Sequence, residues 1–516
     1  MLSLAQRLSN TLLPFAAAST FGASFALAAA PNLCEHGGRW TATATRAPAA
    51  VVAYLDSLGN DRFDLRAACA HWAGTFSKRH QSAADNPQSA HKLSARLIVY
   101  PPEGGNVRQL IPWLQQTGHV REIERTRNFV VATFSKHTRT ERLIAIINSP
   151  QVGYVEPDCD GPDYLTTSLE PGPAATADRH CWQRKARATF PNDPCLDDLW
   201  GHRKIGWDSG VAARSLPRMV AVLDSGIDAT HEDLSSNVVL GLKPRNAPHS
   251  QGGKLNARCA TSGRCYPHGT EMAGTIGGRM DNGIGVAGVA PNSRLLPIVI
   301  SREDRGLLAR ISTIASGIDA AVLDGAEIIN ISAKWPVDSR AISEAIVAAV
   351  GGPSAGRRLV VTGYATGLDR DDRVLEYYPS RYRCLPGVVA AVPTDMRSHE
   401  MFNPKGRPDA TDGRIQAPGV DIVVTTTENS DRGYAMSGSA GASSAAAYVS
   451  GAVALVWGSP PLNKCDAQQI KQLLFCRSKS SNSTRYPWVN VEFLRELANV
   501  DPGADCRTAM EALACN

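Results

Sequence analysis

Three polar residues that lie far apart in the chain have the types that acyl-transfer chemistry needs. Asp224 closes the apolar run "RMVAVLD" and is followed by Ser-Gly, a turn signal. His268 precedes the small-residue run "GTEMAGTIGG", and Ser443 lies among several serines in "MSGSAGASSAAAYVSGAVALVW". A serine hydroxyl becomes a nucleophile when an imidazole takes its proton, and a carboxylate on the other ring nitrogen orients that imidazole. The three residue types could therefore form a nucleophile, a base and an orienting acid.

Each of these residues also has a simpler explanation. Asp224 could cap the turn that follows it, and a single histidine such as His268 is more often structural or exposed. A helix of alanine, serine and glycine suits close packing without any catalysis. The chemistry therefore depends on elements that would bring the three side chains together.

Residues 218 to 457 alternate between strand-like and helical patterns. Short, nearly continuous apolar runs are typical of strands covered on both faces; they occupy residues 218–224, 294–301, 327–332, 358–363 and 387–394. Helical patterns at 311–326 and 340–352 separate some of these runs. The alternation predicts an α/β fold with a doubly wound, mainly parallel sheet, whose sites form at the carboxyl ends of the strands.

The motifs around the three residues resemble the active-site signatures of the subtilisin-like serine proteases. "VAVLDSGIDATHEDL", "HGTEMAGTI" and "GASSAAAYVSGAVAL" occur in that family's order of Asp, His and Ser. The family's serine motif has Gly two residues before the nucleophile, Val six after it and Gly eight after it, and only Ser443 meets these offsets. The resemblance covers about residues 192–478 and implies a serine endopeptidase. Ser443 would attack the peptide carbonyl, His268 would transfer the proton, and Asp224 would orient His268.

An upstream region resembles the inhibitor-like prodomain of these proteases. Strand patterns at 95–102 and 129–135 and a helical pattern at 106–118 indicate a small α+β unit, and the resemblance implies a ferredoxin-like prodomain. A zymogen would then be cut within residues 158–191, although a permanent accessory domain is the alternative. The expected organisation is a signal peptide, an N-terminal extension without assigned role, a prodomain, a linker, a peptidase domain and a C-terminal extension, at residues 1–30, 31–93, 94–158, 159–191, 192–480 and 481–516.

The N-terminus and the cysteines indicate an exported protein. Arg7 precedes the uncharged stretch 11–30, which ends in an Ala-x-Ala pattern typical of a cleaved signal peptide; an uncleaved membrane anchor is the alternative. Twelve cysteines, an even number, are consistent with disulfides in a secreted or periplasmic protein. The sequence does not fix the pairing; the short-loop candidates are Cys259–Cys265, Cys465–Cys476 and Cys506–Cys515. The first of these pairs, with His268, could instead bind zinc, but the usual spacing of a fourth ligand is missing.

Charge and motif context exclude several other classes of partner. The formal net charge of +5 comes from 54 basic and 49 acidic residues that are spread along the chain, which argues against nucleic acid and against an anionic membrane surface. "GIGVAG" at 283–288 matches a dinucleotide fingerprint, yet it does not open a helix after a strand. Protein or peptide substrates and the chain's own prodomain are the expected partners, with no membrane association after signal cleavage.

The oxyanion region departs from the family pattern. The family usually supplies an Asn side chain there, but "LVVTGYATG" at 359–367 contains none. Removal of one such donor lowers turnover by about 10²–10³-fold, a value that comes from a subtilisin itself. The hydroxyl of Tyr364 or Thr366 could substitute, and Ser332 and Lys334 are further candidates for substrate binding. A catalytically impaired scaffold that binds peptides or a partner is the alternative function.

Other departures concern single positions. Glu271 stands where the family often has a histidine, and Lys334 stands where it commonly has glycine, in the strand that pairs with bound peptide. Lys334 could narrow the cleft, favour acidic side chains or point to solvent. Asp233 matches a calcium-binding carboxylate of some members, so calcium is a candidate ligand, although no cofactor is expected to be required.

Overall fold

The computed structural model consists of two compact units. It describes residues 47–58, 65–72, 95–135, 138–159, 180–239, 267–301, 309–335, 337–351, 356–364, 366–368, 374–397, 413–427, 433–437, 441–479 and 486–515. The first unit comprises Met1–Cys159, Val337–Ala341 and Leu368–Arg373. The second comprises Asp160–Pro336, Ile342–Gly367 and Val374–Asn516.

The first unit is built on a four-stranded antiparallel sheet. Its strands are β1 (Arg96–Tyr100), β2 (Val120–Arg125), β3 (Val130–Phe134) and β4 (Tyr154–Pro157), in the order β2-β3-β1-β4. Helix α4 (Val107–Gln116) follows β1, and helix α5 (Thr140–Ile147) follows β3. This succession and strand order are those of a ferredoxin-like split βαβ unit. The α+β fold expected for this part of the chain is therefore present.

Two helices that the sequence did not predict belong to the same unit. They are α2 (Ala49–Leu58) and α3 (Leu65–Trp72). Val51 and Leu55 of α2 are buried in one hydrophobic cluster with the sheet and with α4 and α5. A disulfide joins Cys69 of α3 to Cys159, two residues after the end of β4. Part of the N-terminal extension is thus fastened to this unit both by apolar packing and by a covalent bond.

The second unit contains a six-stranded sheet in which every adjacent pair is parallel. The strand order is β12-β11-β8-β7-β5-β6. The strands are β5 (Met219–Asp224), β6 (Arg294–Val299), β7 (Ile328–Ile331), β8 (Leu359–Gly363), β11 (Val388–Thr394) and β12 (Arg414–Pro418). The chain runs from β5 to β6 on one side and then returns to β7 on the other, so the sheet reverses its winding beside β5. Ligand sites form at the carboxyl ends of strands near such a reversal.

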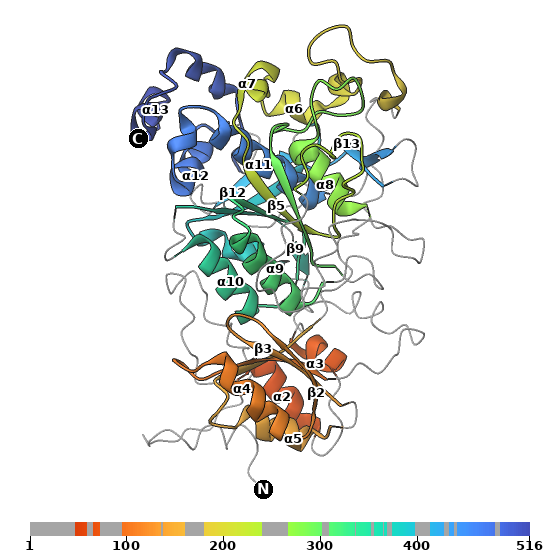
Figure 1. Cartoon of the computed structure of the whole chain (residues 1–516), viewed down its shortest axis with the longest axis vertical. Coiled ribbons are helices and arrows are strands. Elements are labelled where there is room, and N and C mark those ends of the chain that lie inside the picture. Colours follow the sequence, from red (N-terminus) through yellow and green to blue (C-terminus); the bar gives the residue numbers. More distant parts are fainter. Residues whose placement is uncertain are drawn as a thin grey trace. The chain divides into compact units, whose positions relative to one another are not determined.

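Helices cover both faces of this sheet. Helices α8 (His268–Gly277) and α11 (Gly441–Gly458) lie on one face, and α9 (Ile311–Leu323) and α10 (Arg340–Val350) lie on the other (Figure 1). The remaining elements of this unit are shorter; they include α6 (Trp200–Lys204), α7 (Ser209–Arg214), β9 (Thr366–Leu368), β10 (Val374–Glu376), β13 (Ile422–Thr425) and β14 (Tyr434–Ser437). No helix among the described residues is long and apolar enough to span a membrane.

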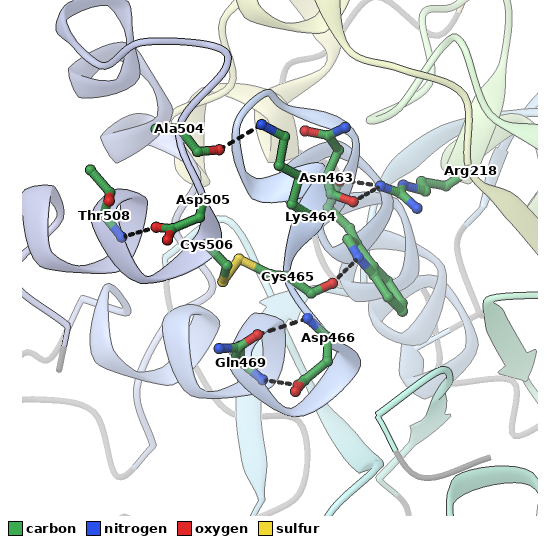
Figure 2. Close-up of a disulfide and its surroundings, with 11 residues drawn as sticks. Arg218, Asn463, Lys464, Cys465, Asp466, Gln469, Ala504, Asp505, Cys506 and Thr508 are labelled. Carbon is green, nitrogen blue, oxygen red and sulfur yellow. Dashed lines mark hydrogen bonds between the residues drawn. A yellow bond between two sulfur atoms is a disulfide. The ribbon is translucent and has the colours of Figure 1, made fainter. Parts of the chain in front are cut away.

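The end of the chain packs into the same hydrophobic core. Helix α12 (Ala467–Cys476), a 3₁₀ helix (Glu492–Asn499) and helix α13 (Cys506–Ala512) all contribute buried apolar side chains to the cluster that contains α11 and the sheet. Hydrogen bonds support this packing, because Lys464 donates to the carbonyl of Ala504 and Arg218 donates to the carbonyl of Asn463 (Figure 2).

The disulfides in this region differ from the expected short loops. Cys465 pairs with Cys506, and Cys476 pairs with Cys515. The expected pairs Cys465–Cys476 and Cys506–Cys515 are therefore wrong. The reason is the helix geometry: Cys465 precedes α12 and Cys476 ends it, so the two cysteines lie at opposite ends of a ten-residue helix. The expected Cys259–Cys265 pair lies outside the described residues.

Candidate active site

Asp224 and His268 form a buried pair at the carboxyl end of β5. His268 is the first residue of α8, and its Nδ1 lies 2.8 Å from Oδ2 and 2.9 Å from Oδ1 of Asp224. A Cβ on Gly269 would lie 2.2 Å from the carbonyl oxygen of Gly226, so only glycine lets α8 begin this close to the strand end. Burial lowers the pKa of His268, but the Asp224 charge and hydrogen bond outweigh it, and the net pKa is raised.

Ser443 lies in the first turn of α11, beside the end of β7. Its hydroxyl donates to the carbonyl of Ser332 at 3.4 Å, and the Ser332 hydroxyl donates to the carbonyl of Ser443 at 3.4 Å. Because β5 and β7 are adjacent, this contact brings the serine to the same sheet edge as Asp224 and His268. Nε2 of His268 is buried and bonds to no described residue. In free enzymes the bond between the base and the nucleophile is often long and tightens when substrate binds.

Asn330 joins the nucleophile's helix to the sheet, a role that the sequence reasoning missed. Its amide nitrogen donates to the Ser332 hydroxyl at 2.9 Å, and its amide oxygen accepts from the Ser450 hydroxyl at 3.0 Å. Asn330 and Ser450 are fully buried. An asparagine inside the apolar run "IINIS" was the available signal, because a buried amide needs partners.

The candidate oxyanion donors have different surroundings. The Tyr364 hydroxyl is fully buried, donates to Glu376 at 2.9 Å and accepts from Arg414 at 3.1 Å. Burial and the Glu376 charge raise the pKa of Tyr364. This engagement counts against the Tyr364 hydroxyl as an oxyanion donor, and the side chain of Thr366 lies outside the described residues. The backbone N–H of Ser443, in the first turn of α11, has no intrahelical partner and points along the positive end of the helix.

The end of β8 nevertheless lies directly against the start of α11. A Cβ on Gly363 would lie 2.6 Å from the carbonyl oxygen of Ala442, the residue before Ser443. The stretch that matches the family's oxyanion region therefore begins next to Ser443.

Lys334 lies two residues beyond Ser332 and is partly buried. Its ammonium group lies 5.1 Å from the centroid of the Tyr377 ring. The neighbouring residues Trp335 and Tyr378 exchange two backbone hydrogen bonds of 2.9 Å, which fixes the two segments side by side. Burial lowers the pKa of Lys334 to about 8. Of the alternatives considered for Lys334, full exposure to solvent does not match this position.

Asp233 is fully buried, and its carboxylate accepts three hydrogen bonds. The donors are the Asn282 amide at 2.7 Å, the Val286 N–H at 3.0 Å and the Tyr434 hydroxyl at 2.9 Å. Burial raises the pKa of Asp233 to about 7 despite these donors. The described part of the chain contains no group of three or more His, Cys, Asp or Glu side chains arranged to hold a metal ion. The carboxylate therefore acts as the centre of a protein-built network.

Comparison with known proteins places this arrangement in a family. A parallel α/β sheet with an Asp–His pair at one strand end and a serine at the start of a buried helix defines a serine hydrolase of the subtilisin-like class. The family model described as "Subtilase family" matches residues 218–487, just over half of the chain. The chain belongs to the subtilase family of serine proteases. The fold and the family that the motifs implied are thus confirmed.

Individual relatives agree with this membership. The major intracellular serine protease of Bacillus subtilis is 34% identical over 251 residues, which covers 48% of this chain and 70% of that protein. Fervidolysin of Fervidobacterium pennivorans is 29% identical over 347 residues, which covers 63% of this chain and 46% of that protein. The crystal structure of fervidolysin superposes with a TM-score of 0.55 at 23% identity, over 78% of this chain and 60% of that chain, and supports the fold.

The pKa of Asp233 generates a prediction for stability. Because folding raises this pKa from 3.8 to about 7, the folded protein holds the proton more tightly than the unfolded chain. The contribution of Asp233 is fully present below about pH 4 and is lost as the pH rises through about 7. The variant Asp233→Asn does not titrate in this range. Between pH 5 and pH 8 we expect the unfolding free energy of the wild type to fall by on the order of 2 kcal/mol relative to the variant.

Urea unfolding at pH 5, 6, 7 and 8 measures this difference. Both proteins should carry Ser443→Ala, so that self-digestion does not distort the curves. Parallel pH profiles for the two proteins would show that Asp233 titrates normally in the folded state.

Proposed function

We propose that the protein is an exported endopeptidase that hydrolyses peptide bonds through Ser443, His268 and Asp224. The observation that carries the proposal is the buried Asp224–His268 pair, at 2.8 Å, on the sheet edge where α11 presents Ser443. The order of the motifs in the chain and the family membership support it.

The chemistry follows from these positions. Nε2 of His268 takes the proton of Ser443 as its Oγ bonds to the substrate carbonyl carbon, and the carbonyl oxygen becomes an oxyanion near the Ser443 N–H. His268 then gives the proton to the leaving amine, and the peptide C–N bond breaks. Water repeats the sequence on the acyl-enzyme, which releases the acid and restores Ser443. Asp224 stays ionised and stabilises the imidazolium throughout.

The alternative is a catalytically impaired scaffold that binds peptides or a partner. The engaged hydroxyl of Tyr364 favours this alternative, because the missing Asn then has no evident side-chain substitute among the described residues. Loss of one donor would lower turnover by about 10²–10³-fold without abolishing acylation. The two functions differ in whether Ser443 reacts at all.

Reaction with a fluorophosphonate probe decides between them. We expect covalent labelling of the wild type and labelling below detection for Ser443→Ala, because the probe reacts with an activated serine. Ser444→Ala is the matched control: Ser444 is the next residue, is fully buried, and its hydroxyl bonds to no described residue, so this variant should label like the wild type. Intact, folded, mature wild type, from which the proposed prodomain has been removed, should label; absence of Ser443-dependent labelling in that protein would support the scaffold.

We propose further that the chain is a zymogen whose first unit is an inhibitory prodomain. The ferredoxin-like strand order of this unit supports the proposal, as does its position before the subtilase region. A permanent accessory domain remains the alternative. Cleavage would fall within residues 158–191, between the last strand of the first unit and the subtilase region.

Incubation of the purified full chain tests autoprocessing. The wild type should yield a new N-terminus within residues 158–191, identified by mass spectrometry, because Ser443 performs the cut. Ser443→Ala should stay full length under the same conditions. Equal persistence of both full-length chains, in a wild type that labels with fluorophosphonate, would favour the accessory domain.

Export and partners complete the proposal. A signal peptide at residues 1–30 would direct the chain to a secreted or periplasmic location, and the disulfides suit that oxidising environment. Protein or peptide substrates and the prodomain would be the partners, without nucleic acid or membrane association after signal cleavage.

We propose that calcium is not required at Asp233. Calcium takes six to eight oxygen ligands, whereas both oxygens of this carboxylate already accept hydrogen bonds from protein donors, so the described surroundings do not fit the ion. The thermal unfolding midpoint of the Ser443→Ala protein should therefore be the same in EDTA and in millimolar calcium. A calcium-dependent rise in the midpoint that Asp233→Asn abolishes would contradict this proposal.

A further inference from the structure

A second carboxylate lies beside the catalytic pair. Glu271 follows His268 by three residues in the first turn of α8. Residues three apart on a helix lie on the same face, with Cβ atoms about 5–6 Å apart. Glu271 is only partly exposed, and no described residue donates a hydrogen bond to its carboxylate. The family often has a histidine at this position.

We propose that Glu271 stabilises the imidazolium form of His268. Two carboxylates would then favour the positive histidine, Asp224 by direct contact and Glu271 by its charge. Its role in turnover rests on the proposed peptidase function, but its effect on His268 does not. Glu271 acts on the reaction only through His268, whose positive form its charge stabilises, so it is a positioning residue and not a catalytic one.

The charges of the three groups are coupled. Burial raises the pKa of Glu271, the His268 charge lowers it, and the Asp224 charge raises it. His268 responds in the opposite sense: after the burial effect, Asp224 and then Glu271 raise its pKa. Because the Glu271 carboxylate is partly buried, its charge interacts more strongly with the charges of His268 and Asp224 than it would in water.

The other elements packed against α8 bring few competing charges. After β5, the Asp228 carboxylate is engaged by the N–H and hydroxyl of Thr230. Strand β13 has no charged residue, and the first turn of α11 offers only hydroxyls. Arg294 begins β6 and is paired with the start of β5, at the opposite end from Asp224. On the side of Ser443, the ammonium group of Lys334 lies over the Tyr377 ring.

This arrangement matters because the transition state carries two charges. Proton transfer from Ser443 makes His268 positive while the substrate carbonyl becomes negative. The family's oxyanion Asn is missing and no side-chain substitute for it is evident among the described residues, so additional stabilisation of the imidazolium would lower the same barrier. Glu271 supplies this stabilisation through its charge, three residues after His268 on α8.

The sign of the effect follows from protonation. Protonated His268 cannot accept the Ser443 proton, so activity is lost below the pKa of His268. Glu271→Gln keeps the shape and removes the charge, which makes the imidazolium less stable and lowers the pKa of His268. The variant should therefore remain active to lower pH, while its rate on the alkaline plateau should fall by about three- to tenfold.

Two measurements test the proposal. NMR titration of the ¹³C-labelled His268 imidazole, in the Ser443→Ala background, follows its pKa without any need for activity. The pH dependence of fluorophosphonate labelling, with Ser443 present, follows the same group through reactivity. Both should shift to lower pH in Glu271→Gln and should return toward the wild type in Glu271→Asp. Glu232→Gln, which removes an exposed carboxylate from the loop after β5, should leave both unchanged.

The possible results are distinct. An unchanged His268 titration in a folded Glu271→Gln protein overturns the proposal, whatever the labelling shows. A shifted titration in a protein whose wild type never labels supports the charge coupling and removes the peptidase function. A shift in the titration together with a shifted acid limb of labelling supports both. If Glu271→Gln unfolds, Glu271→Ala removes the same charge and supplies the comparison with the wild type, Glu271→Asp and Glu232→Gln.

Discussion

The close packing of helix α11 is the constraint on which the second unit depends. Every residue of this 18-residue helix except Ala442 is buried, so it has no solvent face that could carry polar side chains. A helix that is buried all round can lie close to its neighbours only where its residues are small. At Gly451 a Cβ would come within 2.7 Å of the Val289 side chain, and at Gly458 within 2.4 Å of the Leu216 carbonyl oxygen. The small residues therefore set how near the helix lies to the sheet and to α8.

The same packing positions the reactive groups. Because α11 cannot slide or rotate without overlapping its neighbours, Ser443 is fixed at the end of β7. Asn330 of β7 also links the helix to the sheet, because it accepts a hydrogen bond from Ser450 of α11 and donates one to Ser332. Gly269 likewise allows close packing of α8, because without a side chain at this position the helix can begin at His268, next to Asp224. The arrangement of Asp224, His268 and Ser443 thus results from backbone proximity, and the Asp224 charge acts on a histidine that is already in place.

Much of this arrangement could be predicted from sequence because it leaves local signals. Five strands of the parallel sheet appeared as apolar runs, and fixed offsets to glycine and valine identified Ser443 among its neighbours. β12 gave no such signal, because the buried polar residues Arg414 and Gln416 interrupt its apolar pattern. The partners of Tyr364 were also hidden, since Glu376 and Arg414 reach it only through the folded chain. The disulfides between distant cysteines depend on the same long-range contacts, which spacing does not encode.

The C-terminal disulfides have a consequence for a protein that degrades proteins. A protease is exposed to its own active site at the highest local concentration of any substrate, so every accessible loop risks a cut. The loops closed by Cys465–Cys506 and Cys476–Cys515 overlap between residues 476 and 506. A single cut between residues 477 and 505 would leave α13 covalently attached at two points. After such a cut the two crosslinks would keep α13 joined to α12, so their expected contribution is to the kinetic stability of the protein and not to its chemistry.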